Sequence, residues 1–341
     1  MFIKPFHTGH NLVIRRSLIY TLGLLLAWAT NISSPVFGVL VALPIAMQSR
    51  FSVEALLKRY AKQAFSLIAG TLIAEVFWGN NVMIFVMSLI IFYVFIFRVK
   101  YWFQVAFLPT IIFYYMFGVI NSSYGISVEH SLYSLVQCVL IQMPLAWLLF
   151  KAFPVDTKDS SQKLNLNLLQ FRSKVFSIII VSLLLLLFLL IDFSTSVFCI
   201  LVISSCAFSA NDKVFLNNVK EIIPIQVGGC IIALFVNLLL CINTGNILWA
   251  LFVLMIFTGF YLYFAINLHL RVASLDNVNF ENNILRAALI PISLYTSSDS
   301  FSVTSYYHRG YDMIITATVM FIVYQLSKTV LERNTKAEPS V

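Results

Sequence analysis

Residues 154–174, with the sequence PVDTKDSSQKLNLNLLQFRSK, divide the 341-residue chain close to its midpoint. This is the longest run that a membrane-spanning helix could not accommodate, and tracts dominated by Leu, Ile, Val and Phe lie on both sides of it. We therefore predict two membrane halves, residues 1–153 and 174–331. A short linker at 154–173 would join them, and a polar tail at 332–341 would follow the second half.

The composition sets the class of protein. Hydrophobic residues make up 60% of the chain and charged residues 11%, and the mean hydropathy is +0.91. Soluble globular domains carry about 25% charged residues, so these values indicate an all-α polytopic protein of the lipid bilayer. The linker and the loops are too short to hold a sizeable soluble domain.

Apolar segments predict about 12 transmembrane helices, six in each half, because a spanning helix needs about 20 residues. The segments are 17–31, 34–48, 62–78, 82–97, 101–120 and 131–153, followed by 174–192, 195–210, 223–242, 247–267, 283–297 and 309–331. Several are short, so they would tilt or lie where the bilayer is thin. Counts of ten or eleven remain alternatives.

The basic residues alternate between loops in a way that supports this span count. Of the 22 Lys and Arg residues, only Arg309 falls on one side of the predicted membrane, and all the others fall on the opposite side. Lys and Arg mark the cytoplasmic face, so both termini and the linker are predicted to be cytoplasmic. The same bias accounts for the net charge of +8, and no nucleic-acid partner is expected.

Three short stretches of the first half recur in order in the second half, which predicts a duplication. Since each half has six spans, both would enter the membrane from the same side, as parallel repeats related by an axis along the membrane normal. The matches are 35–41 (PVFGVLV) with 196–202 (SVFCILV) at an offset of 161, 70–74 (GTLIA) with 229–233 (GCIIA) at 159, and 107–109 (FLP) with 289–291 (LIP) at 182, after an insertion around 268–282.

Two loops predicted to be cytoplasmic also resemble each other. Residues 52–60 (SVEALLKRY) and 213–220 (KVFLNNVK) each combine apolar and basic positions. We predict short amphipathic helices at the membrane surface, held there by anionic lipid. A docking site for another protein is the alternative.

The order of these features resembles the fusaric-acid-resistance-like superfamily, which includes the aromatic acid exporters of bacterial inner membranes. The features are Arg15 and Arg16 before a short first span, the PVFGVL segment at Pro35, a basic amphipathic loop and a Gly-containing third span, all repeated after a central linker. The resemblance covers most of both halves through loose motifs. Members of that superfamily often carry a large cytoplasmic domain between the halves, whereas this chain has only residues 154–173 there.

The resemblance implies an efflux permease, or a subunit of one, in the bacterial inner membrane. Its cargo would be small organic anions, often aromatic, its energy source a proton gradient, and its partner a periplasmic membrane-fusion (adaptor) protein. A non-transporting scaffold or accessory subunit is the alternative function. The sequence also leaves a homo-oligomer open.

Polar residues inside apolar segments are costly and therefore candidates for function. Glu75, near the outer end of the third predicted span, is the candidate for proton coupling. The alternative is a carboxylate at the membrane interface that reaches water through the adjacent turn. Gln104 and Asn237 are candidates for lining a substrate pathway, with hydrogen bonding between helices as the alternative.

Two prolines and an arginine complete the predicted substrate site. Pro109 and Pro291 would each interrupt a helix at matching repeat positions, a pattern typical of transporter binding sites. Arg309, beside Tyr306 and Tyr307, would suit an aromatic carboxylate through paired hydrogen bonds and stacking. A local ion pair of this arginine with a nearby aspartate is the alternative.

Enzymatic chemistry has little support in the sequence. His308 and Asp312 form His-x3-Asp, one residue short of the His-x4-Asp pattern of glycerolipid acyltransferases, and an acyltransferase-like enzyme is therefore the least favoured alternative. The five cysteines lie in apolar runs without the spacing of a metal site. We expect no catalytic residues, no metal and no cofactor.

Overall fold

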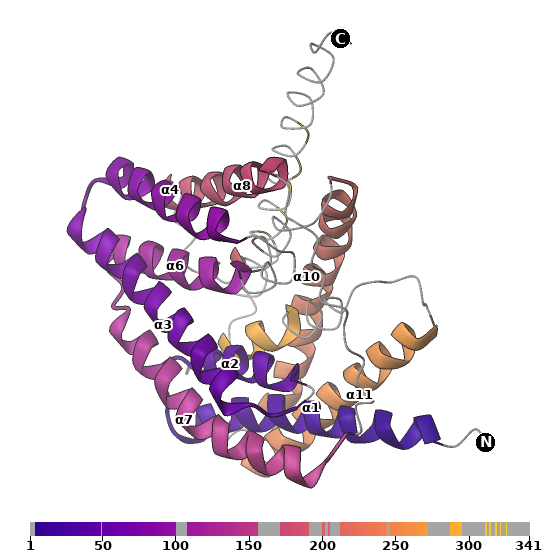
Figure 1. Ribbon diagram of the computed structural model, residues 1–341. Coiled ribbons are helices and arrows are strands. Elements are labelled where there is room, and N and C mark those ends of the chain that lie inside the picture. The colour runs from indigo at the N-terminus through magenta and orange to yellow at the C-terminus, as the bar shows by residue number, and fades with distance from the viewer. Residues whose placement is uncertain are drawn as a thin grey trace, which may run out of the picture. The chain divides into compact units, whose positions relative to one another are not determined.

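The computed structural model describes residues 4–48, 50–99, 108–155, 171–190, 200–201, 204, 212–243, 246–271 and 287–294, together with isolated positions between 311 and 325. Within these residues all regular secondary structure is helical (Figure 1). Four of the described helices are long and apolar enough to cross a membrane: Asn11–Ala29, Asn81–Arg98, Glu129–Ala152 and Ser173–Leu190. The predicted all-helical class is therefore confirmed for the described residues, and these four apolar helices fit a membrane protein, while the count of twelve spans stays a prediction.

The chain forms two compact units that do not follow its two sequence halves. Unit 1 consists of Met1–Ala64, Ser127–Ser161 and Ile225–Tyr307. Unit 2 consists of Phe65–Ile126, Gln162–Pro224 and His308–Val341. Each unit thus combines segments from before and after the linker at 154–173. The predicted halves are two copies of a sequence repeat, whereas the two units are groups of segments that pack together.

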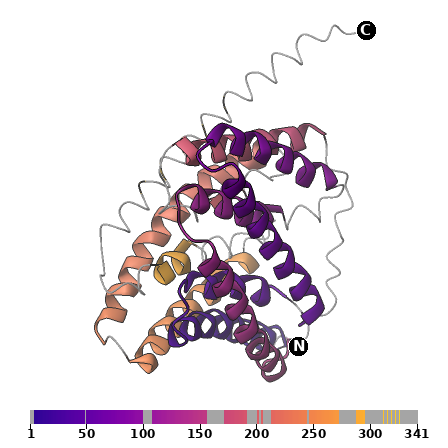
Figure 2. The same ribbon diagram turned by 90° about the vertical axis from the view of Figure 1, so that its left-hand side faces the viewer.

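Helix α1 (Lys4–Ala29) is central to unit 1. It packs against α2 (Val36–Ala46), α7 (Glu129–Ala152) and α11 (Ile247–Arg271), and α2 also packs against α7. Figure 1 and Figure 2 both show α1 and α11 side by side, although they are separated by most of the chain.

Every residue of α2 is buried. A helix that is apolar on all sides belongs in a protein core, and α2 satisfies this by lying between α1 and α7. At 11 residues it rises only about 16 Å, which is short of the hydrocarbon core. The span predicted at 34–48 is therefore shorter than expected.

Unit 2 contains α4 (Asn81–Arg98), α6 (Leu108–Ser123) and α8 (Phe171–Leu190), which pack against one another. The buried face of α4 follows the helical period through Ile84, Ser88, Phe92 and Ile96. Its other faces expose large apolar side chains, which suit lipid rather than water; they include Val82, Val86, Ile90, Tyr93 and Val94.

Tyr115 of α6 forms the polar centre of this unit. Its hydroxyl lies 2.9 Å from the hydroxyl of Ser88, and its ring meets the ring of Phe92 edge-on, with centroids 5.4 Å apart. Both partners come from the buried face of α4. The aromatic and hydrogen-bonded contacts therefore fix α6 against α4.

Helix α3 (Val53–Val76) corrects one prediction. Residues 52–60 were expected to form a separate amphipathic helix, but they are continuous with the following span in one helix. The intervening residues lack the glycine or proline that would end a helix. The predicted helix at 213–220 also belongs to a longer helix, α10 (Asp212–Cys241), which continues through Pro224, Gly228 and Gly229. The two helices begin 159 residues apart, which is the offset between Gly70 and Gly229.

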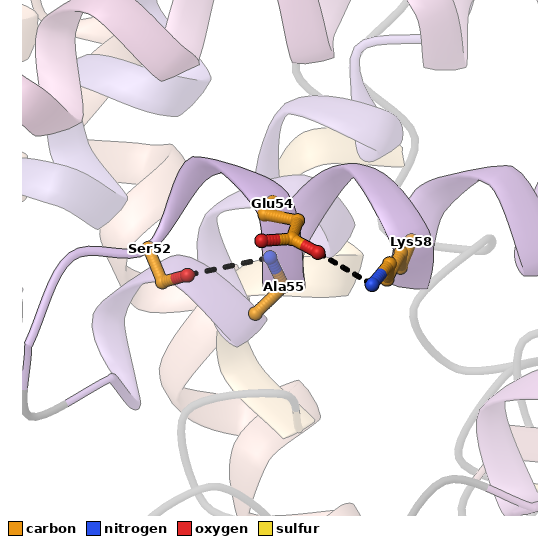
Figure 3. A network of polar contacts seen from close by, with 4 residues as sticks. All are labelled: Ser52, Glu54, Ala55 and Lys58. Carbon is orange, nitrogen blue, oxygen red and sulfur yellow. Dashed lines mark hydrogen bonds and ion pairs between the residues drawn. The ribbon is translucent and has the colours of Figure 1, made fainter.

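The first turns of α3 are stabilised by exposed polar contacts (Figure 3). The Ser52 hydroxyl accepts a hydrogen bond from the backbone N–H of Ala55 at 3.4 Å and so caps the helix. One turn later Lys58 pairs with Glu54 at i,i+4 spacing. Both side chains of this pair are more than 70% exposed, so it contributes only about 0.3–0.5 kcal/mol.

Close helix packing at two glycines stabilises the pairing of α3 with α6. A Cβ atom at Gly70 would lie 2.2 Å from the carbonyl oxygen of Tyr115, and one at Gly118 would lie 2.5 Å from that of Leu67. Small residues allow such approaches between membrane helices. In unit 1 a Cβ atom at Gly229 would lie 2.4 Å from the Cβ of Ala287. The third and fifth predicted spans therefore pack together, and so do the ninth and eleventh.

Candidate functional site

Basic residues gather at one end of unit 1. Near the start of the apolar part of α1, the Arg15 guanidinium donates a hydrogen bond from Nη2 to the carbonyl oxygen of Gln48, at 3.3 Å. The same guanidinium lies over the ring of Phe150 in the last turn of α7, 4.0 Å from its centroid. Asn11 also contacts this end of α7, through a 3.4 Å hydrogen bond to the Pro154 carbonyl. We call this group of contacts the Arg15 junction.

The opposite end of unit 1 is held by uncharged groups. The Ser134 hydroxyl, in the second turn of α7, lies 3.1 Å from the hydroxyl of Ser33 and accepts a hydrogen bond from the Ser34 backbone N–H at 3.2 Å. Both serines belong to the turn between α1 and α2. The turn thus meets the beginning of α7, while the Arg15 junction meets its end.

Unit 2 has the same segregation. Lys174, in the first turn of α8, donates to the Phe97 carbonyl at the end of α4 over 3.4 Å, and its ammonium lies 5.5 Å from the Phe97 ring centroid. Among the described residues, two hydrogen bonds to the other end of α8 come from uncharged groups: Asn81 donates to the Leu189 carbonyl at 3.3 Å, and Tyr124 donates to the Phe188 carbonyl at 2.8 Å. In each unit, the described basic ends of helices meet one another.

Arg15 is more deeply buried than the other basic residues whose burial the structure describes. Its side chain is only 1% exposed, and its Nε atom has no hydrogen-bond partner. Among the described residues no carboxylate lies within ion-pair distance of it; the ion pair described is the exposed one between Glu54 and Lys58. A buried charge without a counter-ion is strongly unfavourable. Arg15 is therefore the candidate for binding an anion.

Gln142 of α7 joins α1 and α2. Its Nε2 donates to the carbonyl oxygens of Gly38 at 2.7 Å and Gly23 at 3.3 Å. A Cβ atom at Gly23 would come within 3.0 Å of that nitrogen, and one at Gly38 within 2.7 Å of the Gly23 oxygen. Gln142 therefore makes the hydrogen bonds between helices that are common in membrane proteins.

A cluster of hydroxyls joins α1 to α11. The Thr258 hydroxyl lies 2.6 Å from that of Ser17 and 3.1 Å from that of Thr21, and all three residues are buried. Thr258 donates its own proton to the Leu254 carbonyl at 2.8 Å. The cluster is therefore satisfied internally, and it acts as a contact between helices.

The predicted residue Glu75 lies in the last turn of α3 and is exposed. Proton coupling by Glu75 and the alternative of a carboxylate at the membrane interface both stay predictions. Asn237, in α10, is buried and has polar contacts within the protein. A pathway role for Asn237 likewise stays a prediction.

The two predicted prolines have different surroundings. Pro109 is the second residue of α6, and its carbonyl accepts a hydrogen bond from the Ser204 hydroxyl at 3.2 Å. Pro291 is buried in the helical segment 287–294. Glu75 and Pro109 belong to unit 2, whereas Asn237 and Pro291 belong to unit 1. The remaining predicted site residues, Gln104, Tyr306, Tyr307 and Arg309, lie outside the described residues.

Three residues of interest were not predicted from sequence. Arg15 was interpreted as a mark of topology and as part of the family resemblance, although its position inside an apolar helix, Asn11–Ala29, is a signal that a charge must be compensated. Pro44 and Pro144 lie inside α2 and α7. They were overlooked because the sequence comparison considered only prolines that match between the halves.

Comparisons of this chain with models of known protein families, with curated proteins and with solved structures find no match.

Proposed function

We propose that this protein is a permease of the bacterial inner membrane that exports small organic anions, with aromatic acids as the principal class. The observation that carries the proposal is Arg15, a buried cation in an apolar helix for which the described residues supply no counter-anion. A scaffold has no need of such a charge. A protein that binds anions in transit through the membrane does.

The proposed architecture is a duplication of six spans whose segments are exchanged between the two units. The chain passes from unit 1 to unit 2 after residues 64, 161 and 307, and from unit 2 to unit 1 after residues 126 and 224. The crossings after 64 and 224 are 160 residues apart, and those after 126 and 307 are 181 apart. These separations agree with the offsets of 159–161 and 182 that the sequence matches predict.

Helix pairing supports the same proposal. Under the duplication, α1 corresponds to α8 and α11 corresponds to α4, and both α1–α11 and α8–α4 are packed pairs. The glycine contacts of Gly70 with α6 and of Gly229 with residue 287 are a second corresponding pair. A duplicated transporter would present two similar units to a substrate.

The proposed orientation has both termini, the linker and the basic ends of both units in the cytoplasm. The meeting of basic helix ends around Arg15 and around Lys174 supports it, because Lys and Arg are retained on that side. The outer ends would then face the periplasm, where an adaptor protein could bind. Proton drive, with Glu75 as the coupling carboxylate, is part of the proposal.

Transport into inverted membrane vesicles tests this function, because their outer surface is the cytoplasmic one. Vesicles that contain the protein should accumulate a labelled aromatic acid when they are energised, and should lose this activity when the proton gradient is collapsed. Vesicles with the same membrane but without the protein are the control. Failure to accumulate any acid of a broad panel would favour a scaffold or accessory subunit.

A further inference from the structure

We infer that Arg15 binds the carboxylate group of the transported organic acid and that Lys174 supplies the corresponding cation in unit 2. The inference rests on the proposed function and adds to it the residues that recognise the substrate. It follows from the contacts at the Arg15 junction and from their partial recurrence in unit 2.

The guanidinium of Arg15 has hydrogen-bonding capacity to spare. It carries five N–H donors in a planar fork, and a single described hydrogen bond uses one of them, over 3.3 Å, to the neutral carbonyl of Gln48. Its Nε donor is buried and unpartnered. Charge-assisted bonds to a carboxylate are shorter, about 2.7–2.9 Å, and stronger. A carboxylate would therefore be a better partner than the carbonyl that the guanidinium now contacts.

The surroundings of Arg15 suit an acid with an aromatic or apolar body. The face of the guanidinium lies on the Phe150 ring, so the edge that carries the donors remains for an oxyanion. Phe51 packs beside Phe150, with ring centroids 5.4 Å apart. An aromatic carboxylate could place its charge on the guanidinium edge and its ring against these side chains.

Burial distinguishes this position from a site for lipid headgroups. Arg15 is 1% exposed, and its guanidinium contacts Phe150 of α7 and Gln48 in the connection after α2. Lys58, on the same chain, has a side chain that is 72% exposed. Headgroup phosphates approach exposed basic residues at the membrane surface, so Lys58 suits them, whereas Arg15 suits a ligand that enters the protein.

The arrangement recurs at the repeat-related position. Lys174 lies 159 residues after Arg15, and 159 is also the offset from Gly70 to Gly229. Like Arg15, Lys174 contacts a carbonyl oxygen at the end of a helix and an aromatic ring. The helices that supply these groups differ between the units. The shared feature is therefore the cation on the corresponding helices α1 and α8.

Binding of an acid would also act on the connection between α2 and α3. A carboxylate that takes the Arg15 donors competes with the Gln48 carbonyl. The side-chain oxygen of Gln48 accepts a hydrogen bond from the Ser52 backbone N–H at 3.2 Å, and Ser52 caps α3. Gln48 thus links the anion-binding residue to the start of the next helix.

Titration of the full chain, purified in detergent, with benzoate tests the inference by calorimetry. Arg15→Gln should weaken benzoate binding by about tenfold to a hundredfold, the range for loss of a hydrogen bond to a charged group. Arg15→Lys, which keeps the charge but loses the fork, should show a smaller loss. Neutral benzamide should bind no more weakly to Arg15→Gln than to the wild type. Lys174→Gln should also weaken benzoate binding.

Lys58→Gln is the matched control, since it removes the same charge from an exposed site in the same unit, and it should leave benzoate binding unchanged. Arg15→Gln that melts at or above the wild-type temperature without ligand, yet binds benzoate more weakly, supports a binding role over a structural one. Unaltered benzoate binding by Arg15→Gln and Arg15→Lys, or no saturable benzoate binding by the wild type, would overturn the inference.

Two further outcomes separate the possible sources of the anion and the two proposals. If phosphatidylglycerol stabilises the wild type but not Arg15→Gln, while benzoate affinity is equal in both, the anion is a lipid phosphate and the carboxylate inference is wrong. If wild-type and Arg15→Gln vesicles transport acids with the same KM, this inference fails and the proposed function stands. If benzoate binding depends on Arg15 but wild-type vesicles transport nothing, the inferred binding site stands and the proposed function fails.

Discussion

Two regions of unit 1 use polar groups in opposite ways. At the start of α3, Glu54 and Lys58 form an ion pair that is largely exposed (Figure 3). At the Arg15 junction, a guanidinium of the same charge is buried against Phe150 and lacks a described counter-ion. Both cations count equally when Lys and Arg residues are used to predict membrane orientation. The free-energy cost of holding the charge differs, because water screens Lys58 whereas protein encloses Arg15. The comparison teaches that a basic residue that sets membrane orientation can be distinguished from one that binds a ligand only when the burial of its side chain is known.

The largest effect is expected where α1, α2 and α7 meet. In Gly38→Leu, the new Cβ atom would lie 2.7 Å from the Gly23 oxygen and 2.9 Å from the Cβ of Ala27, so α2 must shift. We expect a loss of about 3 kcal/mol or more in unfolding free energy, since overpacking of a close contact is costly. Thermal unfolding in detergent measures it. Gly228→Leu is the control, because nothing lies within 4 Å of a Cβ there. An equal loss in both variants would show that the close contact of Gly38 with α1 is not the cause.

The second prediction concerns the charge of Arg15 itself. Arg15→Met should leave the ligand-free protein as stable as the wild type, or more stable by about 1 kcal/mol or more, because it removes the desolvation cost of an unpaired charge. The loss of the ring contact with Phe150 offsets this by about 0.5–1 kcal/mol. Chemical unfolding in detergent without added acid gives the answer. A clear destabilisation would mean that Arg15 is a structural residue.

A third, smaller effect is expected at Gln142. Gln142→Leu removes the hydrogen bonds to Gly23 and Gly38, and pairs of this kind in membranes are worth about 0.6–2 kcal/mol. The unfolding midpoint should fall by a corresponding amount. Gln137→Leu is a suitable control, because that side chain lies on an exposed position of the same helix. Similar losses for both variants would show that the hydrogen bonds of Gln142 to Gly23 and Gly38 contribute nothing specific.

The smallest effect is expected for the exposed pair of α3. A double-mutant cycle with Glu54→Gln and Lys58→Gln should give a coupling energy of about 0.3–0.5 kcal/mol, and it should shrink as salt is added. A coupling energy as large as that of a buried charge pair would mean that the exposed pair of α3 and the buried Arg15 do not differ in energy as proposed.

The long apolar helices were predictable because their signal is local. The segments predicted at 82–97 and 131–153 correspond to α4 (Asn81–Arg98) and α7 (Glu129–Ala152) within a few residues. Continuity of helices was harder to predict. The basic residues near Lys58 resemble a surface helix, and only the absence of a stop signal shows that α3 continues into the span.

Packing between distant segments could not be predicted from one sequence. Hydropathy does not reveal that α1 packs against α11 or that the chain changes units inside α3 and α10. For the same reason the candidate site was only partly predicted. The choice of Glu75 and of the matched prolines rested on residue type and position. Arg15 also lies in an apolar segment, but its burial and its lack of a described counter-ion distinguish it from the other basic residues.

The exchange of segments between units has a consequence for biogenesis. Thr21 and its partner Thr258 are 237 residues apart in the chain. At a synthesis rate of about 5–20 residues per second, α1 would wait on the order of ten seconds or more for α11 to leave the ribosome. During that interval its hydroxyls would face lipid or an insertase instead of their final partner. We therefore expect slow co-translational assembly, in which neither unit completes its helix packing until the second half of the chain has been translated.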